Sequence, residues 1–253
     1  MDDGGRKTTQ GYWDAIWRSP VRMRLPSSLF VATKNMKTLI KSRIRPGMRL
    51  LEIGCSHGKM LAWASAELGA ITAGLDYSEN GIRTARALFD HLRLEADFRC
   101  EDVFATTFEQ GSFDLVCSFG LIEHFDDPTE IVRRHLLLAK PGGRALIAIP
   151  NFRGIYGRLE RWFDPVVLGM HNLNIMDCQV LASLAPDDLA EEVRSFPAGR
   201  LSPWQISFES KWPRGLSKVI CYFFNVLGLI QPMDIESFCP FLVLEMTRKS
   251  ERA

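Results

Sequence analysis

The sequence lacks the patterns that mark several large classes of protein. Its six cysteines are scattered with no CxxC pair, which argues against a zinc site or a disulfide framework. The longest apolar stretch, near residues 216–230, is interrupted by Lys218 and Asn225, whereas a membrane span needs about 20 mostly apolar residues. The polar start of the chain has no signal-peptide core. We therefore expect reduced thiols and a cytoplasmic protein.

An excess of one charge is also missing, because the formal net charge of the whole chain is +1. Such a balance provides no global field for holding a polyanion. With 11 Lys and Arg against 3 Asp and Glu, however, residues 1–50 carry a net charge of +8, and the remainder carries −7. The basic segment is either a solvated helical region or a surface that attracts an anionic partner or substrate.

Short apolar runs bounded by turn residues alternate with segments of helical periodicity. Strands are expected at residues 49–55, 71–77, 98–103, 113–120, 144–150, 189–197 and 238–248. Helices are expected at residues 58–69, 79–94, 129–140, 178–185 and 213–230. This alternation predicts a parallel sheet covered on both faces, and the long apolar final strand is expected inside the sheet rather than at its edge.

A turn rich in small residues, LLEIGCSHG, joins the first expected strand to the first expected helix. Gly54, Ser56 and Gly58 let the backbone bend sharply and approach a ligand closely. A nicotinamide fingerprint, GxGxxG, would need glycine where the chain has Ser56 and Lys59. A phosphate-binding GxxxxGK[ST] loop is absent as well. The turn therefore predicts a ligand site of another type.

Residues 47–150 resemble the class I S-adenosylmethionine-dependent methyltransferases, especially their small-molecule branch. The resemblance rests on LLEIGCSHG, GLDYS, CEDVF, FDLVCSFGLIEHFDDP and LAKPGGRALIAIPN, which follow in order at the usual spacing. Ser56 replaces the commoner middle glycine of the first motif. The resemblance implies an α/β, Rossmann-like, doubly wound sheet of seven mostly parallel strands with helices on both faces. It also implies S-adenosyl-L-methionine as cofactor and S-adenosyl-L-homocysteine as product.

The resemblance also implies roles for individual residues. Glu52 would help to hold the amino-acid end of the cofactor, and Asp76, 22 residues after Gly54, would accept both ribose hydroxyls. Asp102 resembles the residue that accepts a hydrogen bond from the adenine amine, and Phe119 ends the strand beside which the sulfonium lies. The expected cofactor contacts are Tyr12, Trp17, Glu52, Gly54, Cys55, Ser56, Gly58, Asp76, Tyr77, Asp102, Val103 and Phe119.

Methyl transfer from a sulfonium is an in-line displacement, so the protein mainly aligns donor and acceptor and excludes water. A general base is needed only where the acceptor must lose a proton, as a hydroxyl does. His124 and His171 are the candidate catalytic bases, and a packing role is the alternative for each. We expect no metal, because Asp127 is placed to cap a helix and adjacent residues at a strand end point apart.

We expect four parts in the chain. A helical lid segment at residues 1–44 precedes the cofactor-binding core at 45–150, a cap insertion at 151–176, and the C-terminal part of the core at 177–253. Ligands of doubly wound sheets bind beyond the carboxyl ends of the strands, and a dry site needs a cover. The lid and the cap are therefore expected at that end, with Trp17, Tyr156 and Trp162 lining the cover.

These features predict an enzyme that methylates an O or N atom of a small, apolar or aromatic molecule in specialised metabolism. One alternative is a membrane-surface methyltransferase acting on a lipid or prenyl substrate, which the apolar helix at 213–230 supports. The others are an RNA methyltransferase that uses the basic first 50 residues and a non-catalytic cofactor-binding protein. Otherwise no nucleic-acid partner is expected, and the chain is expected to be a monomer or a homodimer.

Overall fold

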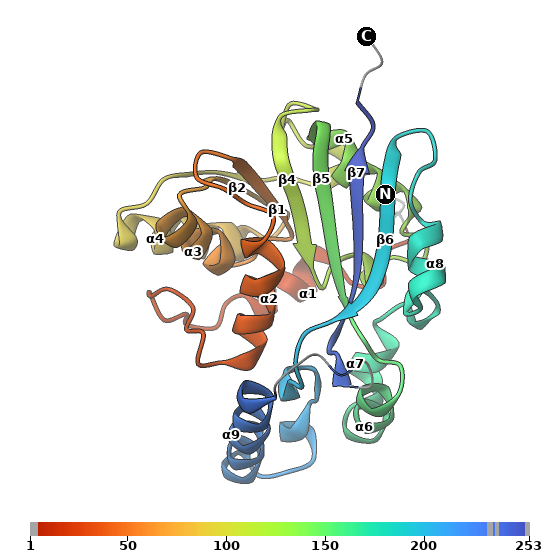
Figure 1. Ribbon diagram of the computed structural model, residues 1–253. Coiled ribbons are helices and arrows are strands. Elements are labelled where there is room, and N and C mark those ends of the chain that lie inside the picture. The colour runs from red at the N-terminus through yellow and green to blue at the C-terminus, as the bar shows by residue number, and fades with distance from the viewer. Residues whose placement is uncertain (1–4, 232–234, 236–237, 251–253) are drawn as a thin grey trace.

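The computed structural model describes residues 5–231, 235 and 238–250. Its centre is a seven-stranded sheet in the order β3-β2-β1-β4-β5-β7-β6 (Figure 1). The strands are β1 (Arg49–Ile53), β2 (Ile71–Asp76), β3 (Ala96–Cys100), β4 (Phe113–Phe119), β5 (Ala139–Pro150), β6 (Ala190–Ala198) and β7 (Phe241–Arg248). The first five strands pair in parallel, and β7 runs antiparallel to both β5 and β6. The seven-stranded, mostly parallel fold is confirmed, as is the interior place of the final strand.

Helices cover both faces of the sheet, because successive strand side chains point to opposite sides and are apolar on both. Leu50 packs in the layer that contains α2 (Val31–Lys41), α3 (Lys59–Leu68) and α4 (Glu79–Leu92). Leu51 packs in the opposite layer, with α5 (Thr129–Leu138) and α8 (Cys178–Ser183). Because α2 contributes Leu39 and Ile40 to the core, the expected lid of residues 1–44 divides into a core helix and a shorter segment before it.

Side-chain caps begin several of the helices. Ser78 caps α4 by accepting a hydrogen bond from the Gly81 amide at 3.1 Å, and Asp177 caps α8 through the Gln179 amide at 2.8 Å. Asp127 is placed differently from the expectation, because Pro128 occupies the N-cap position of α5. The Asp127 carboxylate still accepts a hydrogen bond from the Thr129 amide at 3.0 Å.

The connection between α5 and β5 differs from the sequence prediction. The pattern predicted a helix that ends at Pro141-Gly142-Gly143, yet α5 ends at Leu138 and β5 begins at Ala139. Ala139 pairs with Phe113 of β4, and a register shift follows before the regular pairing resumes. Lys140 forms an ion pair with Asp114 at this irregularity. Pairing with the neighbouring strand therefore overrides the local turn signal.

The remaining helices lie beyond the carboxyl ends of the parallel strands. They are α1 (Gln10–Ile16), α6 (Ile155–Phe163), α7 (Pro165–Gly169) and α9 (Arg214–Ile230), with single turns at Val103–Ala105, Ile122–His124, Leu173–Ile175, Pro203–Gln205 and Phe208–Ser210. Figure 1 shows α6, α7 and α9 beyond one end of the sheet. Within the described residues, no helix is both long and apolar enough to cross a bilayer.

Candidate active site

A cavity of about 1100 Å³ opens at the carboxyl ends of the parallel strands. All of the expected cofactor contacts line it except Gly58, and both candidate histidines line it too. Gly58 instead supports the turn from behind. It has a φ of +66°, and an added Cβ would lie 3.1 Å from both the Ala85 Cβ and the Phe98 ring. The geometry therefore gathers residues from motifs that are far apart in the chain around one cavity.

The turn after β1 is held against the end of β2. Gly54 has a φ of +72° and its amide donates to the Leu75 carbonyl at 2.7 Å. Ser56 has a φ of +48°, which is uncommon for a residue with a side chain, and its amide donates to the Asp76 carboxylate at 2.8 Å. The other carboxylate oxygen of Asp76 accepts from the Ser78 amide at 2.9 Å. The backbone of Tyr77 also hydrogen-bonds this carboxylate, which lines the cavity and can accept from a ribose hydroxyl there.

Glu52 is a buried carboxyl group at the cavity with an unsatisfied oxygen. Its Oε2 atom has no hydrogen-bond partner among the described residues. Burial raises its pKa to about 8, and the charge of Asp76 adds to the shift. An unpaired buried carboxylate is costly, and a cationic ammonium in the cavity would remove that cost. The buried carboxyl group of Glu52 therefore fits the amino-acid end of S-adenosylmethionine.

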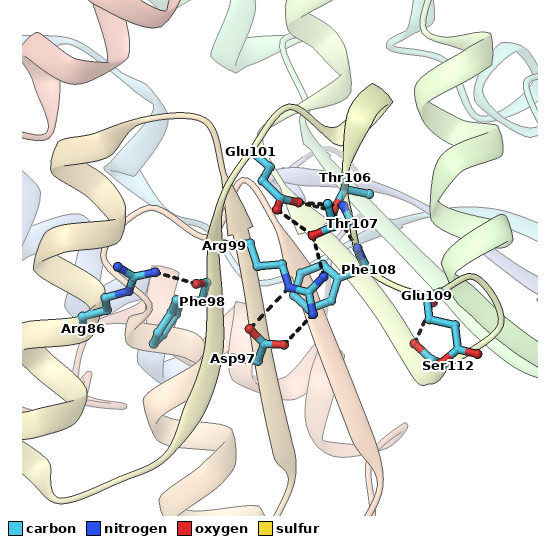
Figure 2. A network of polar contacts seen from close by, with 10 residues as sticks. All are labelled: Arg86, Asp97, Phe98, Arg99, Glu101, Thr106, Thr107, Phe108, Glu109 and Ser112. Atoms are coloured by element: carbon cyan, nitrogen blue, oxygen red, sulfur yellow. Dashed lines mark hydrogen bonds and ion pairs between the residues drawn. The ribbon is translucent and has the colours of Figure 1, made fainter.

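The loop after β3 carries Asp102 and is held by a polar network, shown in Figure 2. Glu101 accepts hydrogen bonds from the Thr107 amide at 2.8 Å and the Thr106 hydroxyl at 2.9 Å. The Asp102 carboxylate accepts from the Phe104 amide at 3.0 Å and from the Arg6 guanidinium at 2.6 Å. Asp102 is thus already engaged, and a contact with adenine would share it with Arg6. Sequence reasoning missed Arg6, because it belongs to no motif.

The segment before α2, which contains the expected lid, lines one side of this cavity. The Asp14 carboxylate accepts a hydrogen bond from the Ser78 hydroxyl at 2.6 Å, which fastens α1 to the start of α4. Trp13 and Trp17 stack on one helix face, as their spacing predicted, with ring centroids 5.6 Å apart. Trp17 also packs edge to face on His57, at 4.9 Å between ring centroids. Tyr12, Trp13 and Trp17 therefore form an aromatic part of the cavity wall.

His124 and His171 lie side by side, with ring centroids 4.8 Å apart. The Nδ1 atom of His124 is 3.0 Å from the Met170 carbonyl, and that of His171 is 2.8 Å from the Val167 carbonyl. Because a carbonyl only accepts, each Nδ1 carries the proton and each Nε2 keeps its lone pair. Burial lowers the pKa of His124 to about 4, with His171 adding to the shift, and burial also lowers the pKa of His171. Both rings are therefore neutral bases at pH 7.

Glu123 lies beside this histidine pair. Burial raises its pKa to about 8, and its Oε2 atom has no hydrogen-bond partner among the described residues. One ligand atom from each of Glu123, His124 and His171 lies within 4.8 Å of the others, a donor set of the kind that binds divalent transition metals. The argument that adjacent side chains point apart is therefore wrong here. The expectation of no metal stays a prediction.

Asn172 positions the cap insertion against the end of β4. Its backbone amide donates to the Glu123 carbonyl at 2.6 Å. Its side-chain amide donates to the Phe125 carbonyl at 3.0 Å and to the Asp126 carbonyl at 2.9 Å. These bonds fix residue 171 next to residue 124. Asn172 escaped the sequence reasoning because its three partners lie more than 40 residues away.

The aromatic lining of the cap differs from the expectation. Tyr156 is buried, and its hydroxyl donates to the Phe238 carbonyl at 2.9 Å and accepts from the Ser202 amide at 3.1 Å. Trp162 is 53% exposed and lies outside the cavity lining. Helical phase explains the difference, since periodicity predicts which residues share a face but not which neighbour that face meets. The apolar lining on this side comes from Phe30, Phe152, Met170 and Trp204.

Comparisons with known proteins agree with this geometry. Residues 51–147 match the family model described as methyltransferase domain. The ubiquinone biosynthesis O-methyltransferase of Coxiella burnetii (strain Dugway 5J108-111) is 29% identical over 135 residues, which cover 53% of this chain and 57% of that protein. That of Xanthomonas axonopodis pv. citri (strain 306) is 34% identical over 114 residues, which cover 44% and 47%. The chain thus spans about half the length of these curated relatives.

Among solved structures, phosphoethanolamine N-methyltransferase 2 of Haemonchus contortus, in complex with phosphomonomethylethanolamine and S-adenosylhomocysteine, is similar in fold. Its TM-score is 0.60 at 19% sequence identity, over 87% of this chain and 52% of that one. The family match identifies residues 51–147 as a methyltransferase domain, and the strand order around them is that of the Rossmann-like fold expected for the class I S-adenosylmethionine-dependent enzymes. The cofactor of that family is S-adenosylmethionine.

Proposed function

We propose that this protein transfers the methyl group of S-adenosylmethionine to an oxygen or nitrogen atom of a small, apolar or aromatic molecule, with a hydroxyl oxygen as the first candidate. The observation that carries the proposal is the pair of neutral imidazoles, His124 and His171, which both line the cavity and whose Nδ1 atoms face backbone carbonyls. The similarity to ubiquinone biosynthesis O-methyltransferases supports an oxygen acceptor.

The bound cofactor would supply a methyl group that is already activated as a sulfonium. Glu52 would hold the cationic ammonium, and Asp76 would accept from the ribose hydroxyls while its backbone bonds keep the turn after β1 in place. The lid would exclude water, which otherwise competes with the acceptor oxygen for the methyl group. One imidazole Nε2 would take the proton of the acceptor hydroxyl.

The chemistry of the cavity wall indicates the kind of acceptor. Phe30, Phe152, Met170 and Trp204 line the cavity and offer apolar contact area, with polar groups such as Gln205 and Asn225 among them. A peptide or a sugar would leave many polar groups unpaired against such a wall. The wall therefore supports an apolar or aromatic acceptor.

Two measurements on the purified chain test the proposal. Calorimetry should show micromolar binding of S-adenosylhomocysteine and no binding of NAD. Incubation with S-adenosylmethionine and a panel of catechol, phenol, a long-chain alcohol and an aromatic amine should release S-adenosylhomocysteine with at least one acceptor, as measured by mass spectrometry. Cofactor binding with no release from any acceptor would favour a non-catalytic protein, and a lack of cofactor binding would end the proposal.

A further inference from the structure

Helix α9 presents a row of large apolar side chains to solvent, whereas its two buried residues, Ser217 and Gly228, are small. Ser217, Cys221, Asn225 and Gly228, at helical spacing, lie on its inner side. A Cβ on Gly228 would lie 2.1 Å from the Leu201 carbonyl oxygen, so the helix approaches its neighbours closely. The outer side, named the α9 face below, consists of Leu216, Val219, Tyr222, Phe223, Val226 and Ile230, which are 48% to 70% exposed.

An ordinary surface helix turns its apolar stripe toward the core and a polar face toward water, whereas the face of α9 that meets water is apolar. A contiguous exposed apolar patch marks a surface that meets something other than water. Exposed Trp204 belongs to the turn Pro203–Gln205, which packs beside α9 and extends the patch. Trp and Tyr are the side chains enriched where a membrane meets water.

A basic segment without acidic residues includes the chain before α2 and helix α2 itself, which contacts α9. The Val31 amide donates to the Asn225 side chain at 2.8 Å, and the Asn225 side chain donates to the Leu29 carbonyl at 2.8 Å. These bonds place the chain before α2 against α9. From residue 15 to residue 51 the sequence has nine Lys and Arg and no Asp or Glu. In that stretch the exposed Arg18, Arg22 and Arg24 form no ion pair with any residue that the structure describes.

Helix α9 itself carries only positive charge, on Arg214 and Lys218, both near its start. In a symmetric homodimer the same patch would meet itself, so these basic groups would be brought toward one another. RNA would pair with the arginines but would leave the exposed aliphatic side chains without a partner. An anionic bilayer satisfies both halves of the surface, because apolar side chains enter the acyl boundary while arginines meet lipid phosphates.

We propose that the α9 face and the neighbouring basic segment dock this protein on an anionic membrane surface, with α9 lying in the plane of the interface. Lys218, Cys221 and Tyr222 of the same helix also line the cavity. Docking therefore brings one wall of the cavity to the bilayer, and on the proposed function an apolar acceptor dissolved in lipid reaches the site without crossing water.

Sedimentation with sucrose-loaded vesicles tests the docking. The full chain should bind vesicles of equal phosphatidylcholine and phosphatidylglycerol much better than pure phosphatidylcholine, and high salt should weaken the binding. Phe223→Glu, at a position that is 60% exposed, should lower the partition coefficient at least about tenfold. The matched control is Ile71→Glu, 59% exposed at the opposite end of the sheet, which should change nothing. The double variant Arg18→Gln/Arg24→Gln should lower binding about fivefold per charge removed.

Circular dichroism and S-adenosylhomocysteine affinity in solution show whether each variant is folded, and they separate this proposal from the proposed function. Absence of binding to the anionic vesicles would overturn the docking, as would an equal loss in Phe223→Glu and Ile71→Glu. If the chain does not bind vesicles but forms a dimer that Phe223→Glu dissociates, the α9 face would be assigned to a contact with a second copy. Binding to bulk transfer RNA but not to vesicles would assign the basic segment to RNA.

Discussion

The Arg6 guanidinium donates a hydrogen bond to the Asp102 carboxylate at 2.6 Å, across 96 residues of sequence. One residue later, the Lys7 amide donates to the His124 carbonyl at 2.7 Å. The segment before α1 is therefore attached to the loop after β3 and to the loop after β4, which form two sides of the cavity. Because the same segment continues into α1, the lid is fastened on both sides of the site that it covers.

Deletion of residues 1–20 should cripple turnover and leave the core folded. The two core clusters contain none of the described residues before Leu25, whereas Trp17 and Arg6 line the cavity. Cofactor affinity should fall much less than activity, because Glu52 and Asp76 remain. Circular dichroism, calorimetry and product release measure the three properties. Asp14→Ala should lower turnover less than the deletion does. Full activity of the truncated chain would show that residues 1–20 are not needed to cover the site.

Asp76→Ala should weaken cofactor binding, since a hydrogen bond to a charged group contributes about 1.5–3 kcal/mol. The variant also removes the acceptor for the Ser56 and Ser78 amides, so the turn after β1 loses an anchor. Calorimetry with S-adenosylhomocysteine measures the change. Asp97→Ala is the control, because Asp97 pairs with Arg99 at the surface. An unchanged affinity in Asp76→Ala would rule out the ribose contact.

Ser56→Leu should fold but lose cofactor binding, because a bulky side chain at this turn would occupy the path of the cofactor. Ser56→Gly is the matched variant. The φ of +48° at this position is a conformation that glycine adopts without strain, so this variant should keep its affinity and gain slightly in stability. Thermal melts and calorimetry measure both properties. Normal affinity in Ser56→Leu would show that the turn does not approach the cofactor.

The unfolding free energy should fall as the pH rises from 6.5 to 8. Burial raises the pKa of Glu52 and of Glu123 to about 8 from an ordinary 4.5, so the native state holds protons that the unfolded state releases. Burial lowers the pKa of His124 and of His135 to about 4. These two groups make the unfolding free energy rise with pH, but mainly below pH 6.5. In the chosen window each buried carboxyl contributes a slope of up to about 1.4 kcal/mol per pH unit.

Urea unfolding at several pH values measures this slope. Glu52→Gln and Glu123→Gln should each flatten it, because an amide does not titrate. The exposed Glu109→Gln serves as control and should leave the slope unchanged. A slope that survives both buried substitutions would show that these carboxyls do not carry the pH dependence.

His171→Ala should separate two kinds of acceptor. With a neutral alcohol the loss of a general base should cost about 10²–10⁴-fold in rate, and with an acidic phenol the loss should be modest. Because burial lowers the pKa of His171, the alcohol reaction should stay active below pH 6.5. Initial rates of product release over pH measure both effects, with the exposed His91→Ala as control. Equal losses with both acceptors would indicate a packing role for His171.

The core of this protein could be predicted from its sequence because the signals there are local. Alternating runs locate the strands, Ser78 and Asp177 start helices through amides two or three residues away, and the order of the five motifs places Glu52 and Asp76 at strand ends. Each of these relationships depends on backbone geometry over a few residues. The interior place of the final strand could also be predicted, because its long apolar run is read directly from the sequence.

Only the tertiary structure decided the rest. The pairing of Arg6 with Asp102, the approach of His171 to His124 and the bonds of Asn172 join segments that no local pattern links. The exposure of the α9 face to solvent was also decided by the tertiary structure. Periodicity determines which side chains share a face of a helix, but the direction of that face depends on what packs against it.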